Sequence, residues 1–131
     1  MDGKLKGKKI MWVEDDSFLS DIIARKLSVY GCVLVSARDG EQALSIVEKE
    51  IPDIILLDIL LPGMSGFELL EKLKSNEKIK NIPVIILSNL SQKSDIEKGK
   101  ELKAERFLVK ATLTLDEIMR QIGEILEETK K

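Results

Sequence analysis

The sequence predicts a single α/β domain built on a parallel β-sheet, and three observations lead to this fold class. Short apolar runs alternate five times with amphipathic segments along the 131 residues, which is the pattern of repeated strand–helix units. The apolar runs are nearly continuous, as expected for strands that are buried on both faces of a sheet. The chain carries no internal repeat or low-complexity stretch, and its length suits one domain with its own core.

The apolar runs are the expected strands. The first and third each run directly into acidic residues. Pro83 precedes the fourth run, and Pro62, Gly63 and Gly66 turn the chain away from the end of the third. The expected strands cover residues 9–13, 32–37, 54–57, 84–87 and 106–109.

The amphipathic segments are the expected helices. The fourth, from about Gln92 to Leu102 with Ser91 as its cap, has the fewest apolar anchors and should be the weakest. Thr114 and Glu117 form a capping box for the last helix. The inward residues are expected to be Phe18, Leu19, Ile22, Ile23, Leu27 and Tyr30 in the first helix, Ala43, Leu44 and Val47 in the second, Phe67, Leu70 and Leu73 in the third, Ile96 and Leu102 in the fourth, and Leu115, Ile118, Met119, Ile122, Ile125 and Leu126 in the last.

Polar side chains follow four of the five expected strands at the point where each strand ends. Glu14 and Asp15 follow the first strand, Asp58 the third, Ser88 the fourth and Lys110 the fifth. In a parallel sheet the carboxyl ends of all strands lie on one rim, where ligands bind. We therefore expect these side chains to converge on one site.

The residue types at this rim suit phosphoryl chemistry. Glu14, Asp15 and Asp58 repel one another unless a cation neutralises them, and an all-oxygen set suits Mg²⁺, with Mn²⁺ as the alternative. Asp58 is placed to attack phosphorus, while Lys110 and Ser88 are placed to hold the remaining phosphoryl oxygens.

Each of these residues also has a purely structural explanation. Asp15 and Asp16 can cap the following helix, and for Asp16 this explanation is the better one. A serine at a strand end is often a turn hydroxyl, and a lysine after a strand is usually solvated. Four such groups at four strand ends favour a shared site over four separate explanations.

The composition excludes several other function classes. The absence of histidine rules out histidine catalysis, histidine metal ligation and histidine phosphotransfer by this chain. Cys32 is the only cysteine, so we expect a buried structural thiol in a reducing compartment. The 21 basic and 23 acidic residues give a net charge of -2, which weighs against a nucleic-acid surface. Residues 1–9 lack an apolar stretch and no window reaches membrane-spanning length, so we expect a cytoplasmic protein without membrane contact.

From Lys9 to Glu127 the chain resembles the receiver domain of two-component response regulators, of the chemotaxis-regulator-like kind. The motifs that match are Trp12-Val13-Glu14-Asp15-Asp16, Leu56-Leu57-Asp58 with Leu61-Pro62-Gly63-Met64-Ser65-Gly66, Ser88, and Val109-Lys110. The resemblance implies a flavodoxin-like, doubly wound (βα)5 domain with strand order 2-1-3-4-5 and helices on both faces. We place this domain at residues 9–128, between a flexible flank at 1–8 and a tail at 129–131.

The resemblance also implies roles for the site residues. Asp58 would accept a phosphoryl group from the phosphohistidine of a sensor histidine kinase or a histidine phosphotransfer protein. Asp15, Asp58 and the backbone carbonyl of Leu60 would bind Mg²⁺, with Glu14 helping through water. The chain would then be a signalling switch rather than a metabolic enzyme, limited to accepting and slowly losing phosphate.

The same resemblance implies how the signal would leave the domain. Phosphorylation would draw Ser88 toward the phosphoryl group, and Phe107 would turn inward and remodel the surface of the fourth helix, fifth strand and last helix. Because no output domain follows the last helix in this sequence, we expect output through a downstream protein or onward phosphotransfer. The fourth-helix face also leaves open a homodimer.

Four residues depart from the family pattern. Ala111 replaces the proline that usually follows the lysine, so Lys110 is presented either by a rearranged loop or by a strained one. Asn89 replaces a small residue and either narrows the site or hydrogen-bonds the phosphate. Phe107 lacks the hydroxyl of the commoner tyrosine. Lys103 replaces a glycine, which predicts strain if the turn needs a positive φ.

Leu60 and Leu90 lie two residues beyond Asp58 and Ser88, at positions that tune phosphate loss in this family. Our hypothesis is that both shield the phosphoryl group without positioning water, which would make the phosphorylated state long-lived. The alternative is that they are loop leucines used only for packing.

Two other function classes share parts of the pattern. A pseudo-receiver would use the same fold as a constitutive interaction module. Asn89 and Ala111 favour this class, whereas the intact Asp58 and Lys110 argue against it. A metal-dependent phosphohydrolase with an aspartyl nucleophile typically has a second acid two residues later, where this chain has Leu60.

Overall fold

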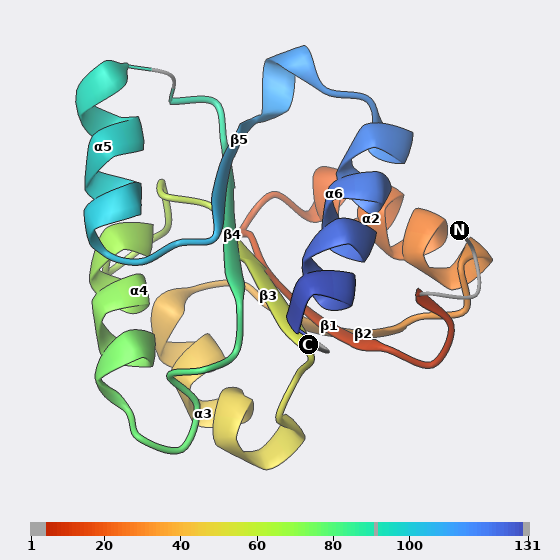
Figure 1. Ribbon diagram of the computed structural model, residues 1–131, viewed down its shortest axis with the longest axis horizontal. Coiled ribbons are helices and arrows are strands. Elements are labelled where there is room, and N and C mark those ends of the chain that lie inside the picture. Colours follow the sequence, from red (N-terminus) through yellow and green to blue (C-terminus); the bar gives the residue numbers. More distant parts are fainter. Residues whose placement is uncertain (1–4, 91, 130–131) are drawn as a thin grey trace.

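The computed structural model describes residues 5–90 and 92–129 and has a central sheet with helices on both faces (Figure 1). All paired strands run parallel, in the order β2-β1-β3-β4-β5. The predicted doubly wound fold and its strand order are therefore confirmed. The strands are β1 (Lys9–Val13), β2 (Val33–Ala37), β3 (Ile54–Leu57), β4 (Val84–Ser88) and β5 (Arg106–Val109).

The helices divide between the two faces of the sheet. Figure 1 shows α2 and α6 on one face and α3, α4 and α5 on the other. Each face has its own hydrophobic cluster, because alternate residues of the strands point to opposite sides. The helices are α2 (Ser17–Val29), α3 (Gly40–Glu50), α4 (Gly66–Ser75), α5 (Lys93–Glu101) and α6 (Leu115–Thr129), with a short 3-10 turn, η1 (Lys110–Thr112), after β5.

The strand register brings the polar residues to one level at the rim. Val13 at the end of β1 lies opposite Leu57 at the end of β3, so the residues that follow them leave the sheet together. Ser88 at the end of β4 lies opposite Val109 of β5, which directly precedes Lys110. The strand register therefore determines which side chains meet at the rim.

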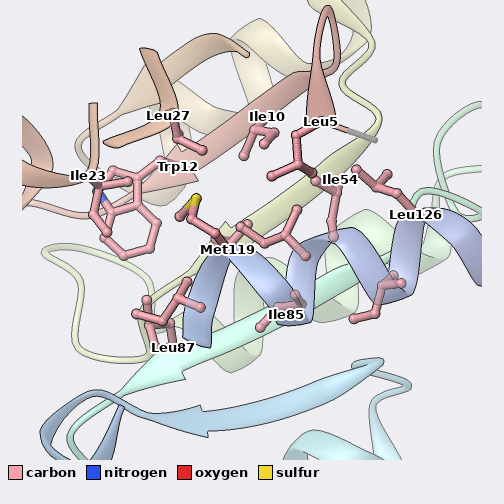
Figure 2. Close-up of a cluster of buried hydrophobic side chains, with 14 of the residues drawn as sticks. Leu5, Ile10, Trp12, Ile23, Leu27, Ile54, Ile85, Leu87, Met119 and Leu126 are labelled. Carbon is pink, nitrogen blue, oxygen red and sulfur yellow. The ribbon is translucent and has the colours of Figure 1, made fainter. Parts of the chain in front are cut away.

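The core on the α2 and α6 face extends to a residue that precedes β1. Leu5 is fully buried and packs into this cluster (Figure 2). Its carbonyl accepts a hydrogen bond from the Cys32 thiol at 3.3 Å, and the Gly7 N–H donates to the carbonyl of Gly31 at 2.8 Å. Residues 1–8 were expected to be a flexible flank, but the segment from Leu5 onward is part of the domain.

The helices follow the sequence pattern with two corrections. Phe18 at the start of α2 is 67% exposed and Ile96 of α5 is 41% exposed, so neither is the inward anchor that we expected. Leu102 is half-buried and packs against the core as expected. The N-cap of α5 is Gln92, which makes no side-chain cap bond, and Ser91, the expected cap, lies outside the described residues.

The remaining helix ends match their sequence signals. Asp39 and Ser65 accept hydrogen bonds from the first turns of α3 and α4. At the start of α6, Glu117 accepts from the Thr114 N–H at 3.0 Å and the Thr114 hydroxyl accepts from the Glu117 N–H at 3.1 Å, so the capping box is present. In the part of the chain that the structure describes, no helix has the length and apolar character needed to cross a membrane.

Candidate functional site

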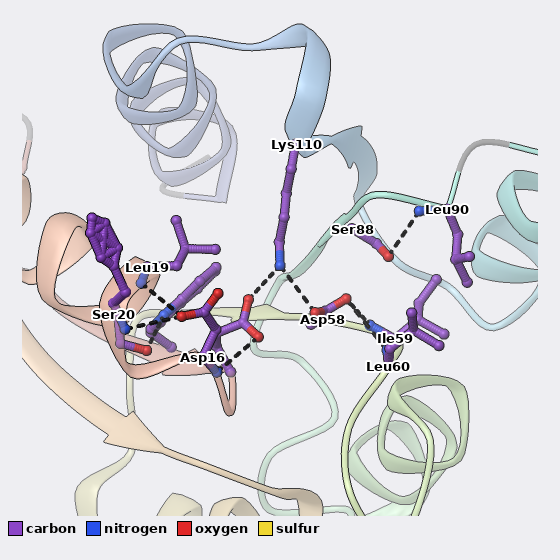
Figure 3. A network of polar contacts seen from close by, with 12 residues as sticks. Asp16, Leu19, Ser20, Asp58, Ile59, Leu60, Ser88, Leu90 and Lys110 are labelled. Carbon is purple, nitrogen blue, oxygen red and sulfur yellow. Dashed lines mark hydrogen bonds and ion pairs between the residues drawn. The ribbon is translucent and has the colours of Figure 1, made fainter.

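Asp58 lies where the buried strand β3 reaches the rim. Its side chain is held by its own backbone, because Oδ1 accepts a hydrogen bond from the Ile59 N–H at 2.7 Å and a longer one from the Leu60 N–H at 3.4 Å (Figure 3). The residue is only 7% exposed. One oxygen is thus fixed by the backbone, and the other faces the centre of the site.

Lys110 connects three strands at the centre of the site. Its Nζ lies 3.0 Å from Asp58 Oδ2 and also pairs with Glu14 Oε1 (Figure 3). Glu14 and Asp58 are both buried, and the aliphatic stem of Lys110 lets the ammonium reach them from the end of β5. Two buried carboxylates therefore share one cation, which leaves an excess negative charge in a poorly solvated place.

The pKa values of this cluster follow from burial and pairing. Burial raises the pKa of Glu14, and the hydrogen bond from Lys110 opposes that shift. Burial alone would lower the pKa of Lys110, but its hydrogen bonds to Glu14 and Asp58 outweigh this effect and raise it. Lys110 is therefore held in its charged form at neutral pH.

Asp15 is exposed, whereas Glu14 and Asp58 are buried. It lines an open cavity of about 740 Å³ together with Arg38, Asp39, Glu41, Gln42, Ser45 and Pro62. Asp16 caps α2, as the sequence indicated, by accepting from the N–H groups of Phe18 and Leu19 at 3.0 and 3.2 Å. Of the three acids expected to bind the metal, Asp15 alone lies outside the cluster of Lys110, Glu14 and Asp58.

The oxygen donors at the rim suit a hard cation, although the acidic side chains are not arranged to hold one in this structure. Glu14, Asp15, Asp58 and backbone carbonyls offer only oxygen atoms, and the buried pair carries more negative charge than Lys110 offsets. Across residues 5–90 and 92–129, no three acidic, histidine or cysteine side chains lie close enough together to hold a metal ion. Metal binding by Glu14, Asp15 and Asp58 together therefore requires their side chains to rearrange.

Ser88 completes the rim from β4. Its side chain is fully buried, and its hydroxyl accepts a hydrogen bond from the Leu90 N–H at 3.3 Å. Leu90 is half-buried against the core, while Asn89 between them is exposed. Leu60, on the other side of Asp58, is 63% exposed. The two leucines of the tuning hypothesis therefore lie in different environments.

Phe107 and Ala111 lie on either side of Lys110 along the chain. The Phe107 ring is half-buried and packs toward α5, where a Cβ on Gly99 would come within 3.2 Å of it. Ala111 belongs to the 3-10 turn η1, and the Lys110–Ala111 peptide bond is trans. Of the two arrangements that the sequence left open for Lys110, the rearranged loop is the one observed.

Gly66 positions Asp58 and was noted in the sequence only as a turn residue. A Cβ at this position would lie 2.1 Å from the Asp58 carbonyl oxygen and 2.7 Å from the Ile59 Cα. The Gly66 N–H also donates to the Ile59 carbonyl at 2.8 Å. Only glycine lets α4 begin this close to the end of β3, and a glycine directly after the helix cap Ser65 was the signal for it.

Comparisons with known proteins agree with this geometry. A family model described as the response regulator receiver domain matches residues 10–123. The probable transcriptional regulator ycf27 of Guillardia theta is 32% identical over 124 residues, which cover 95% of this chain and 47% of that protein. The phosphate regulon transcriptional regulatory protein PhoB of Pseudomonas aeruginosa is 32% identical over 123 residues, which cover 94% of this chain and 53% of that protein. The chain thus spans about half the length of these relatives.

Solved structures show the same fold. The BeF3-activated N-terminal receiver domain of RstA from Klebsiella pneumoniae superposes with a TM-score of 0.83 at 28% identity, over 90% of this chain and 97% of that one. The signal receiver domain of a signal transduction histidine kinase from Syntrophus aciditrophicus superposes with a TM-score of 0.87 at 27% identity, over 95% of this chain and 94% of that one.

Proposed function

Because the chain belongs to the response regulator receiver family, we propose that it is a phosphorylation-controlled signalling switch with Asp58 as its phosphoacceptor. Receiver domains are signalling modules rather than metabolic enzymes, and they work with histidine kinases in two-component systems. The observation that carries the proposal is the contact of Lys110 with both Glu14 and Asp58, which joins β1, β3 and β5 at one buried point.

The chemistry expected of these residues is a transfer between two partners. A carboxylate oxygen of Asp58 attacks the phosphorus of a phosphohistidine, a new P–O bond forms, and the P–N bond breaks with its electron pair going to the histidine nitrogen. The Lys110 ammonium and the Ser88 hydroxyl bind the phosphoryl oxygens and stabilise their charge. The Ile59 N–H keeps the Asp58 carboxylate oriented for the attack.

We further propose that Glu14, Asp15, Asp58 and the backbone carbonyl of Leu60 hold Mg²⁺, or Mn²⁺ in its place. When bound, the ion neutralises the charge between the carboxylate and the incoming phosphoryl group. Exposed Asp15 turns toward Asp58 in this state. Its exposure supports this step, because little packing has to be broken.

The proposed switch connects the phosphoryl group to the surface formed by α5, β5 and α6. Ser88 exchanges its Leu90 partner for a phosphoryl oxygen, and Phe107 turns inward from its present place beside Gly99. A downstream protein, a histidine phosphotransfer partner or a second copy of the chain then reads the altered surface.

The test is the intact mass after incubation with acetyl phosphate and Mg²⁺, with Asp58→Ala and a Mg²⁺-free sample alongside. One phosphoryl adduct that requires both Asp58 and the metal is the expected result. A folded protein that binds Mg²⁺ without gaining an adduct would instead be a pseudo-receiver, and Asn89 and Ala111 would be the residues to revert.

The lifetime of the adduct tests the roles of Leu60 and Leu90. We expect Leu60→Gln and Leu90→Gln together to speed phosphate loss, because polar side chains can position water near Asp58. An unchanged decay rate in the double variant would leave both leucines with packing roles only.

A further inference from the structure

Lys74, near the end of α4, lies far from Asp58 along that helix and lines two cavities at the amino-terminal edge of the sheet. One cavity of about 390 Å³ is lined by Lys74, Lys80, Asn81, Lys103 and Glu105. A second, of about 250 Å³, is lined by Glu71, Lys74, Ser75, Glu101, Leu102 and Lys103. Lysines outnumber acids in the first cavity, so it favours an anion.

Two backbone carbonyls hold the amine of Lys74 in place. Nζ donates hydrogen bonds to the carbonyl of Lys80 at 3.3 Å and to the carbonyl of Ile82 at 3.1 Å. A neutral amine has two N–H groups and one lone pair, so these two carbonyls take both hydrogens and leave the lone pair available. An ammonium group can make the same two hydrogen bonds, so these contacts fix the position of the nitrogen beside the cavity without selecting its protonation state.

The net effect of the surroundings is to lower the pKa of this amine. Burial lowers the pKa of Lys74, Lys103 lowers it further, and Glu105 opposes them. Lys74 therefore carries a larger neutral fraction at a given pH than an ordinary surface lysine. The titratable groups that face it across the two cavities are Glu71, Lys80, Glu101, Lys103 and Glu105.

We propose that Lys74 is an acylation site whose donors are acyl phosphates, with Lys80 and Lys103 binding the phosphate of the donor. The Lys74 nitrogen attacks the acyl carbon, a C–N bond forms, and the C–O bond to phosphate breaks. Inorganic phosphate leaves with the electron pair, and the proton lost from the nitrogen passes to water. The product is an uncharged amide at Lys74.

Lys72 provides a matched control within the same last turn of α4. It is exposed, whereas Lys74 is half-buried and hydrogen-bonded to two carbonyls. The proposal requires Lys74 to react faster than Lys72 although it is less accessible. If Lys74 were only a structural lysine that holds the connection between α4 and β4, Lys72 would react faster.

The experiment measures acetylation of each lysine by peptide mapping after incubation of the full chain with acetyl phosphate across a pH series. We expect Lys74 to be acetylated several-fold faster than Lys72. As the pH is raised, the rate at Lys74 should reach its plateau at a lower pH than the rate at Lys72. Equal or slower reaction of Lys74 would overturn the proposal. Lys74→Arg, which keeps hydrogen-bond donors to the two carbonyls, should remain folded and lose only this adduct.

Acetic anhydride separates the role of the cavity from that of the amine, because this donor carries no phosphate. Lys80→Ala should slow acetylation of Lys74 by acetyl phosphate and leave its reaction with acetic anhydride unchanged. An equal effect on both donors would remove the phosphate-binding role of Lys80. The acetyl adduct on Lys74 and the phosphoryl adduct on Asp58 differ in mass and position, so this proposal and the proposed function stand or fall separately.

Discussion

Helices α5 and α6 lie on opposite faces of the sheet beside β5, and they are attached to it very differently. Helix α6 buries a full stripe of apolar side chains (Figure 2), namely Ile118, Met119, Ile122, Ile125 and Leu126. Within α5 the only buried residue is Gly99. Local stability follows the number of buried apolar contacts, so α5 can move at low cost while α6 acts as an anchor.

Polar contacts strengthen the same contrast. Arg106 of β5 pairs with Glu124 and Glu128 of α6 at 2.7 and 3.3 Å and also contacts Gln121. These partly exposed pairs contribute at most about 1 kcal/mol each, but they tie β5 to α6. These contacts would keep the strand with α6 if α5 shifted against it, as the proposed switch at Phe107 requires.

The largest expected difference comes from removing one apolar side chain in each helix. Ile122→Ala in α6 should lower the free energy of unfolding by about 3 kcal/mol, because it leaves a cavity in the core. Ile96→Ala in α5 should change it by less than about 0.5 kcal/mol, because that side chain is already exposed. Urea unfolding measures both, and equal losses would contradict the contrast.

The glycines of the two helices provide a second comparison. Gly123→Ala in α6 should stabilise the protein by about 1 kcal/mol, because helix propensity improves and the nearest atom to the added Cβ is 4.0 Å away. Gly99→Ala should instead cost about 1 kcal/mol in net terms, because its Cβ would lie 2.9 Å from the Ile86 Cδ1 and 3.2 Å from the Phe107 ring. Thermal unfolding gives the sign of each change in stability. An NMR signal of the Phe107 ring that moves in Gly99→Ala and not in Gly123→Ala would connect α5 to the proposed switch.

The turn that follows α5 holds a residue in a strained conformation. Lys103 has a φ of 71°, as the departure from the family glycine suggested. Lys103→Gly should stabilise the protein by up to about 1 kcal/mol, because glycine adopts this conformation without steric cost. Lys100→Gly, inside α5, should cost about 1 kcal/mol and serves as the control. A destabilising Lys103→Gly would mean that the side chain contributes more than the strain removes.

The smallest expected effect is a pH dependence at the start of α6 that is absent at the start of α5. Hydrogen bonds with the backbone and hydroxyl of Thr114 lower the pKa of Glu117. A depressed carboxyl pKa means that the cap stabilises α6 above the ordinary glutamate range and weakens as the pH falls through the lowered pKa. An NMR titration should show the Thr114 amide signal moving in acid and the Gln92 amide, at the uncapped start of α5, staying still. Glu117→Gln should abolish the movement, and a movement that persists would assign it to another acid.

The sequence predicted the strands and the rim residues well, for a physical reason. Continuous apolar runs are typical of strands buried on both faces of a parallel sheet, and the carboxyl ends of such strands lie at one rim. The contact of Lys110 with both Glu14 and Asp58 was not predicted, because it depends on how far a flexible side chain reaches across the rim. The place of Asp15 beside a separate cavity depends likewise on loop geometry.

The wrong predictions of burial for some apolar residues have a different cause. Periodicity tells which face of a helix a residue occupies, but not whether the neighbouring layer extends as far as that residue. Phe18 and Ile96 lie near helix starts beyond the covering layer, and both are exposed. Leu5 is the reverse case, because a single leucine among lysines and glycines has no periodicity, and its burial follows from the tertiary fold alone.

The burial of Leu5 bears on how a minimal version of this domain should be cut. Trimming the chain to residues 10–123, the range of the family match, removes Leu5, Ile125 and Leu126 together. All three side chains belong to the same cluster, in which Figure 2 shows Leu5 and Leu126, so such a fragment would open its core to water. Boundaries for expression or for fusion to another domain should therefore lie outside Leu5 and Leu126.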